Sequence, residues 1–150
     1  MSSKRPSRRL SLTVAERAQW RCEYCLSPAA YSAQPFEVDH IIPTSKGGQT
    51  TLDNLAFSCG CNGHKSNHTH AQDPETGRRV PLFNPRRQRW TRHFAWSEDF
   101  THIAGRTMTG RATTEALRLN RSELINLRLG ETTWYNAPWH YAGTRIERSE

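Results

Sequence analysis

The chain has 150 residues, which is enough for one domain with a small extension but not for two full hydrophobic cores. Only 35% of the residues are apolar, against a usual share, which also counts glycine, of about 45–50%, so we expect something besides hydrophobic burial to stabilise the fold. No run approaches the roughly 18 apolar residues of a membrane span, and no apolar stretch of a secretory signal follows the basic residues at the start. The composition therefore predicts a soluble, cytoplasmic protein.

The net charge of +7 comes mainly from arginine, because the chain contains 18 Arg but only 3 Lys. The basic residues flank a nearly neutral stretch over residues 31–70. A guanidinium group pairs with phosphate oxygens through two parallel hydrogen bonds, so an arginine excess favours a nucleic-acid partner. A solvated basic face would give the same excess, and charge alone does not distinguish DNA from RNA.

The first part of the chain predicts one helix and one strand. We expect residues 1–10 to form a disordered basic tail. The run over residues 13–20 suits a short helix, with Ser11 or Thr13 as its N-cap. Residues 36–42 first alternate between polar and apolar and then become apolar, which indicates a strand.

The rest of the chain is expected to contain helices, a turn and a hairpin. A short helical turn capped by Thr51 is predicted over residues 52–57, and another helix begins near Asn62. The remaining predicted elements are a turn at 73–77, a hairpin with arms at 89–96 and 100–104, and helices at 107–119 and 122–129, the last ended by Gly130. Residues 131–150 show no periodicity and are treated as a C-terminal tail.

Four cysteines fall into two close pairs, Cys22 with Cys25 and Cys59 with Cys61. In a cytosolic chain such pairs indicate a metal site before they indicate disulfides. The first pair has the C-x2-C spacing that offers two sulfurs to a tetrahedral zinc ion from one turn, whereas the second is one residue shorter. We therefore expect structural zinc on Cys22, Cys25 and Cys61, with Cys59 or a nearby histidine as the fourth ligand. Free buried thiols and a redox pair are the alternatives.

Further motifs surround these pairs in a fixed order. They are the segment Phe36–Pro43 with Asp39 and His40, the pair Gly47-Gly48, the segment Asp53–Leu55 with Asn54, and Asn62-Gly63-His64-Lys65 directly after Cys61. Together with the cysteines, this set over about residues 15–70 resembles the HNH endonuclease family. In layout, residues 71–130 also resemble the tails of small bacterial HNH proteins, through their Asp-Pro-Glu-Thr-Gly, Pro-Leu-Phe-Asn-Pro-Arg and Gly-Arg-Ala-Thr segments.

The resemblance implies an α+β fold with a ββα-metal core over residues 11–70 and an accessory extension of a hairpin and helices over 71–130. It implies metal-dependent hydrolysis of phosphodiester bonds in DNA, with double-stranded DNA as the main expected substrate. The products would carry a 5′-phosphate and a 3′-hydroxyl. In this family Asn54 would hold the connecting loop and orient His40.

The residue types themselves suit that chemistry. Histidine takes up and releases protons near neutral pH, so His40 can serve as the base that activates water. Asp39 and Asn62 offer hard oxygen ligands to Mg²⁺ or Mn²⁺. Neighbours on a strand point to opposite faces, so Asp39 and His40 can share a site only at a strand end or bulge. In the alternative interpretation, Asn54 is a turn residue and Asn62 a plain helix cap.

Several basic residues are candidates for nucleic-acid contacts. His64 could contact phosphate or act as an additional metal ligand, and we expect Lys65 to contact phosphate rather than be buried. Arginines interleaved with Trp90 and Phe94 favour binding to a nucleic-acid backbone, although a solvated basic face with Trp90 in the core is equally consistent. These arginines are Arg78, Arg79, Arg86, Arg87, Arg89 and Arg92.

Two further functions compete with the nuclease. A non-catalytic zinc module that only binds nucleic acid would use the same cysteines and arginines, but it would not need Asp39, His40, Asn54 and Asn62 together. A redox-sensing cysteine protein would need the four thiols alone. The sequence does not determine the recognition site, the oligomeric state, or whether one or both strands are cut.

Overall fold

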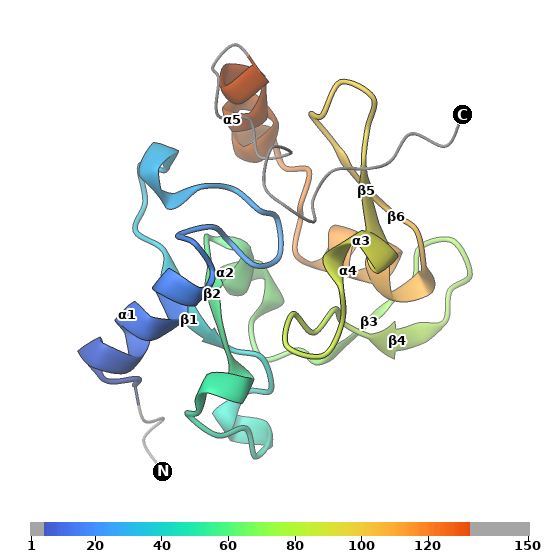
Figure 1. Cartoon of the computed structure of the whole chain (residues 1–150). Coiled ribbons are helices and arrows are strands. Elements are labelled where there is room, and N and C mark those ends of the chain that lie inside the picture. The colour runs from blue at the N-terminus through green and yellow to red at the C-terminus, as the bar shows by residue number, and fades with distance from the viewer. Residues whose placement is uncertain (1–4, 133–150) are drawn as a thin grey trace.

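The computed structural model describes residues 5–132 as a mixed α+β fold (Figure 1), which confirms the predicted fold class. The helices and strands are α1 (Arg8–Arg17), β1 (Glu37–His40), β2 (Leu55–Ser58), α2 (Cys61–Lys65), β3 (His70–Gln72), β4 (Arg79–Pro81), α3 (Trp90–His93), β5 (Phe94–Trp96), β6 (Ile103–Gly105), α4 (Met108–Ala116) and α5 (Ser122–Thr132). Short 3₁₀ turns lie at Ala29–Tyr31, Thr44–Lys46 and Leu52–Asn54. Within the described residues, no helix has the length and apolar character needed to cross a membrane.

The antiparallel hairpin of β1 and β2 positions the motif residues Asp39 and His40 between two helices. Side chains alternate between its faces. The face that carries Leu55 and Phe57 packs against α1. The other face, which carries Asp39 and Ala56, turns toward α2 and the cysteines. His40 is the last residue of β1 and pairs with Leu55, so it stands at a strand end.

The first helix begins earlier than the sequence predicted. Ser7 is the N-cap, and its hydroxyl accepts a hydrogen bond from the backbone N–H of Leu10 at 3.1 Å. The arginines and leucine that follow are good helix formers, so residues 8–10 are helical and the expected disorder of residues 1–10 is wrong for this part. The helix ends at Arg17, before Gln19 and Trp20 take positive φ values of 55° and 57°.

The predicted helical turn at residues 52–57 is correct only in its first half. Leu52–Asn54 form a 3₁₀ turn, and Thr51 precedes it without a side-chain capping bond. From Leu55 the chain continues as β2, because Leu55 and Phe57 pack against α1 while Ala56 faces the opposite side. Burial on both faces explains why this strand lacks the polar alternation that would have identified it.

The extension contains one hairpin that was predicted and one that was not. The turn expected at residues 73–77 joins β3 to β4, strands too short for a recognisable alternation. Asp73 fixes this hairpin to α4, because Arg111 donates two hydrogen bonds of 2.9 Å to its carboxylate. The second hairpin, β5 with β6, follows the prediction, although its first arm starts as the helical turn α3.

The last two helices also lie close to their predicted positions. Thr107 caps α4, and its hydroxyl accepts from the backbone N–H of Gly110 at 3.0 Å. The expectation that Gly130 ends the final helix is wrong, because α5 continues through it to Thr132. The remainder of the predicted tail, from residue 133 onward, lies outside the described residues.

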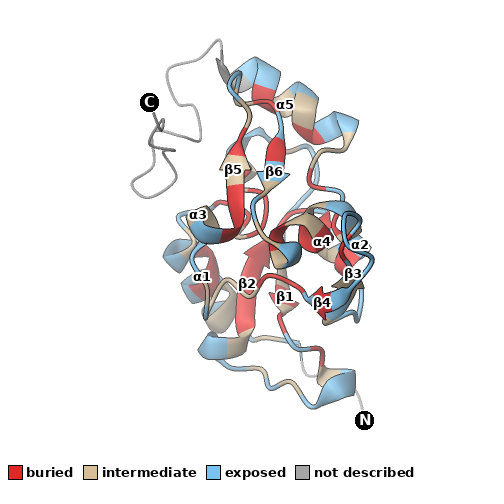
Figure 2. Cartoon of the chain, turned by 90° about the vertical axis from the view of Figure 1, so that its right-hand side faces the viewer, coloured by how far each residue is buried: buried red, intermediate tan, exposed pale blue. Residues whose placement is uncertain are grey.

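One hydrophobic cluster joins the cysteine-bearing part of the chain to the extension. It contains all four cysteines together with Phe83, Phe94 and Leu124. Figure 2 shows the buried residues running through the middle of the molecule, including β2 and β5. Residues on both sides of position 70 therefore share one buried cluster.

Candidate functional site: a cysteine cluster beside a histidine-bearing hairpin

The four cysteines meet in the core at the junction of three segments. The first pair comes from the turn after α1, and the second comes from the end of β2 and the start of α2. Their sulfurs all lie within 4.8 Å of one another, and the Sγ atoms of Cys25 and Cys59 are 3.5 Å apart. A zinc ion bonded to four sulfurs at about 2.3 Å separates them by about 3.8 Å, so this cluster fits a tetrahedral zinc ion. Cys59 is the fourth member of this cluster, in the place for which the sequence left a histidine as the alternative.

Hydrogen-bond donors surround the sulfurs. Backbone N–H groups of Cys25 and Cys61 point at the sulfurs of Cys22 and Cys59, at 3.5 and 3.4 Å. Burial raises the pKa of the Cys22 thiol, whereas hydrogen bonds from the neighbouring cysteines lower the pKa of Cys59. Arg121 adds two N–H groups, which lie 3.4 Å from Cys61 Sγ and 3.5 Å from Cys59 Sγ.

Asp39 lies on the α2 face of β1, where two side chains engage its carboxylate. The hydroxyl of Tyr24, which stands between the first two cysteines, donates to Asp39 Oδ2 at 2.7 Å. The ammonium of Lys65 lies 3.1 Å from the same oxygen. Burial raises the pKa of Asp39, although Lys65 and Tyr24 act in the opposite direction. Burial and the carboxylate also raise the pKa of Tyr24, so its phenol stays a donor.

His40 and Asn54 lie at the two ends of the loop that joins β1 to β2. The amide of Asn54 accepts from Ile42 N at 2.9 Å and donates to Ile42 O and Gln49 O at 3.0 and 2.9 Å. Thr50, the next residue, lies with its hydroxyl 2.9 Å from His40 Nε2. Asn54 thus closes the loop, and the closed loop supplies the hydrogen-bond partner of the histidine ring.

Two consecutive glycines make this closure possible. Gly47 has a φ of 86°, in the left-handed region that favours glycine. A Cβ on Gly48 would lie 1.7 Å from Ile42 O and 2.9 Å from the amide nitrogen of Asn54. The Gly-Gly pair is therefore required by backbone geometry within the loop that holds His40.

Asn62 faces β1 from the first turn of α2. Its amide nitrogen donates to Glu37 Oε2 at 2.8 Å, which directs the amide away from a simple helix-capping role. Glu37 and Asp39 are two residues apart on β1, so their side chains lie on the same face of the hairpin, the face turned toward α2. The oxygens of these three residues have the chemistry that Mg²⁺ or Mn²⁺ prefers, although the Lys65 ammonium already neutralises Asp39.

The residues predicted to contact nucleic acid divide into two groups. His64, Arg87 and Arg89 are exposed, and Arg87 lines a pocket of about 470 Å³ with Lys46 and Lys65 beside the loop that follows His40. The expectation that Lys65 stays out of the interior is wrong: its side chain is 2% exposed, because Asp39 offers a buried counter-charge.

The arginine-rich stretch after residue 77 is similarly mixed. Arg78, Arg79 and Arg92 are exposed, but Arg86 forms an ion pair with Glu23. The interleaved aromatics belong to the core, since Phe94 is buried and Trp90 packs against the cluster that contains the cysteines.

Three residues of this region were not identified from the sequence as part of the site. Tyr24 and Glu37 stand next to motif residues, but nothing in their spacing predicts which carboxylate or amide they contact. Arg121 comes 60 residues after Cys61, so only the folded chain brings it to the sulfurs.

The HNH endonuclease family matches residues 22–68 of the chain. This stretch runs from Cys22 through β1, β2 and α2 and includes all four cysteines, His40 and Asn54. No curated protein and no solved structure matches the chain.

Proposed function

We propose, from the match of residues 22–68 to the HNH endonuclease family, that the chain hydrolyses phosphodiester bonds in double-stranded DNA. The observation that carries the proposal is the loop clamp: Asn54 closes the loop after β1, and Thr50 of that loop bonds the ring of His40. A base must be held in one orientation to remove a proton from an attacking water. The clamp supplies that orientation.

In the proposed reaction, His40 removes the proton from the water that attacks phosphorus. The bond between phosphorus and the 3′ oxygen breaks, and that oxygen takes a proton from solvent, which leaves a 5′-phosphate and a 3′-hydroxyl. Asp39 and the amide oxygen of Asn62 would hold Mg²⁺ or Mn²⁺, which stabilises negative charge on the phosphoryl and leaving oxygens. The donation from Asn62 to Glu37 supports this role, because it leaves the amide oxygen available.

Lys65 adds a requirement to this scheme. Its ammonium bonds both the Asp39 carboxylate and the backbone oxygen of His40, at 3.1 Å each. Binding of a divalent ion by Asp39 therefore competes with Lys65 for the same carboxylate. The exposed His64, Arg87 and Arg89 would contact the phosphates on either side of the cleaved bond.

The test is cleavage of supercoiled plasmid in Mg²⁺, in Mn²⁺ and in EDTA, with wild type, His40→Ala and His68→Ala. His68 is exposed and serves as the matched histidine control. We expect open-circle or linear DNA with wild type and the control in either metal, and a rate at least about 100-fold lower with His40→Ala. Cleavage by His40→Ala at the wild-type rate would remove His40 from the mechanism.

One observation favours a second candidate, a zinc-stabilised module that binds nucleic acid without cutting it. The Asp39 carboxylate is already paired with Lys65 and Tyr24, as in a site built for structure alone. This candidate predicts that the plasmid is retarded on a gel in a salt-sensitive way but is not cut in either metal. The same experiment therefore distinguishes the two functions.

A further inference from the structure

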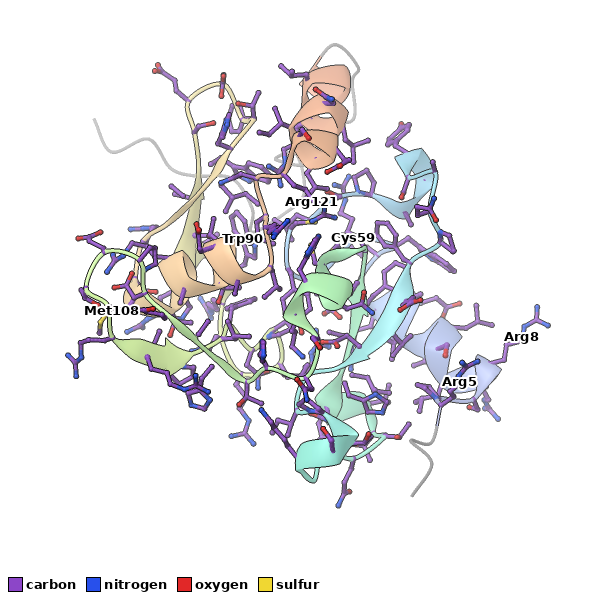
Figure 3. The ribbon with its side chains drawn as sticks, turned by 180° about the vertical axis from the view of Figure 1, so that it is seen from behind. Arg5, Arg8, Cys59, Trp90, Met108 and Arg121 are labelled. Atoms are coloured by element: carbon purple, nitrogen blue, oxygen red, sulfur yellow. The ribbon has the colours of Figure 1, made fainter. Side chains whose placement is uncertain are left out.

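The short cysteine pair is covered by an arginine from the far end of the described chain. Arg121 lies in the turn between α4 and α5, and its two terminal nitrogens reach the sulfurs of Cys61 and Cys59 at 3.4 and 3.5 Å. Figure 3 shows Arg121 beside Cys59, where the chain leads into α5. We propose that Arg121 is a positioning residue of the metal site, which holds two thiolates for the ion and balances their charge.

The charge of the site explains why a cation is needed there. Four thiolates around one divalent zinc ion carry a net charge of about −2, and the four cysteines are all buried. Moving an uncompensated charge into a protein interior costs several kcal/mol per ion. Two backbone N–H groups point at the sulfurs, but they carry only partial charges. Among residues 5–132, Arg121 supplies the full positive charge that is in hydrogen-bond contact with the sulfurs. The buried guanidinium of Arg128 also acts on the cysteines through its charge, but its hydrogen bonds go to oxygens.

The protein fixes the orientation of this guanidinium. Its Nη1 also donates to the backbone oxygen of Arg118 at 3.1 Å. A Cβ on Gly60 would lie 3.5 Å from Nη2, so the group lies across the middle residue of the short pair. Leu119 and Leu124 on either side are buried in the core and anchor the turn.

A purely superficial role for Arg121 does not fit these contacts. The nearby carboxylate is that of Glu123, whose Oε2 lies 3.8 Å from Arg121 Nε. The Glu123 side chain is 77% exposed, against 18% for Arg121. An exposed pair of this kind contributes little. The two bonds to sulfur, together with the bond to Arg118 O, are thus the interactions that hold the side chain, and through Arg121 the extension takes part in metal retention.

Zinc affinity provides the first test, and it does not depend on nuclease activity. Purified wild type, Arg121→Ala, Arg121→Gln and Arg121→Lys are loaded with one equivalent of Zn²⁺ and titrated with a chromophoric chelator. Arg79→Ala is the control, because Arg79 is exposed and its loss changes the net charge equally. We expect zinc affinity to fall about 10–100-fold in Arg121→Ala, by less in the Lys and Gln variants, and not at all in Arg79→Ala.

Replacement of zinc by Co²⁺ provides a readout that a merely structural role would not change. Hydrogen bonds to a metal-bound thiolate lower the energy of its electrons, so their loss shifts the sulfur-to-cobalt charge-transfer band to longer wavelength. We expect this shift in Arg121→Ala and an unchanged band in Arg79→Ala. The proposal is overturned if Arg121→Ala keeps both the wild-type zinc affinity and the wild-type band, or if the wild type binds neither ion.

Discussion

The buried ion pair of Lys65 with Asp39 allows a quantitative prediction about stability. Lys65→Met keeps the length and the apolar stem of the side chain but removes the charge, and it leaves the Asp39 carboxylate buried with Tyr24 as its remaining partner. Removing one partner of a buried pair destabilises a protein by about 3–5 kcal/mol. For a chain of this size, each kcal/mol lowers Tm by about 2–4 °C, so we expect Tm to fall by about 6–20 °C at pH 7.

The loss of stability in Lys65→Met should also depend on pH. Burial already raises the pKa of Asp39 and Lys65 opposes this, so the pKa rises further in Lys65→Met. When folding raises the pKa of a carboxyl group, the folded protein is more stable with that group protonated than with it ionised. The loss of stability in Lys65→Met is therefore largest at neutral pH. The difference in Tm between variant and wild type should shrink as the pH falls from 7 toward the ordinary aspartate value of about 4.

Thermal unfolding followed by circular dichroism measures both effects. Lys46→Met, at an exposed position, controls for the loss of a lysine. The double variant Lys65→Met/Asp39→Asn removes both charges and leaves an amide that can still accept from Tyr24, so it should recover much of the lost stability. An unchanged Tm in Lys65→Met, or a loss that is the same at every pH, would refute the assigned ion pair.

Three other predictions concern the loop, the acid range and the metal. Gly48→Ala should reduce plasmid cleavage at least about tenfold without loss of zinc. The added Cβ would lie 1.7 Å from Ile42 O and would shift the loop that holds the histidine. Gly63→Ala is the control and should leave cleavage unchanged, because nothing lies within 4 Å of a Cβ at that position. Arg111 lowers the pKa of Asp73, and the Ser97 hydroxyl lowers the pKa of Asp99 to about 2. The stability that these two carboxylates contribute is therefore present above about pH 4 and is lost as the pH falls toward 2. An Asp73→Asn variant that loses as much stability with acid as wild type would contradict this. Removal of zinc by a chelator should lower Tm, and addition of zinc should restore it. A chelator-treated protein that keeps the wild-type Tm would show that the cysteines hold no structural ion.

The parts of the fold that sequence reasoning identified are those with a fixed local spacing. The C-x2-C turn, the Asp39-His40 pair and the Gly-Gly loop each place several constrained residues within a few positions, and the family match confirms the region they mark. Strands of three residues, such as β3 and β4, contain too few positions for a period to be visible.

What the sequence could not reveal depends on contacts between distant segments. Tyr24 reaches Asp39 across 15 positions, and Arg121 reaches Cys61 across 60. Lysine is rarely buried, so the sequence favours a phosphate contact for Lys65 over a place in the interior. Its burial follows from the acidic partner on the adjacent strand, which no local pattern encodes.

The three separate two-stranded sheets of residues 5–132 have a consequence for self-association. Each strand pairs with one neighbour, so each leaves one edge without a sheet partner. Such edges can template the addition of strands from other molecules, and proteins guard against this with short strands and charged edge residues. Here the strands are only three or four residues long, and β1 begins with exposed Glu37. We therefore expect the free edges of these hairpins to resist pairing with strands of other molecules while the chain folds.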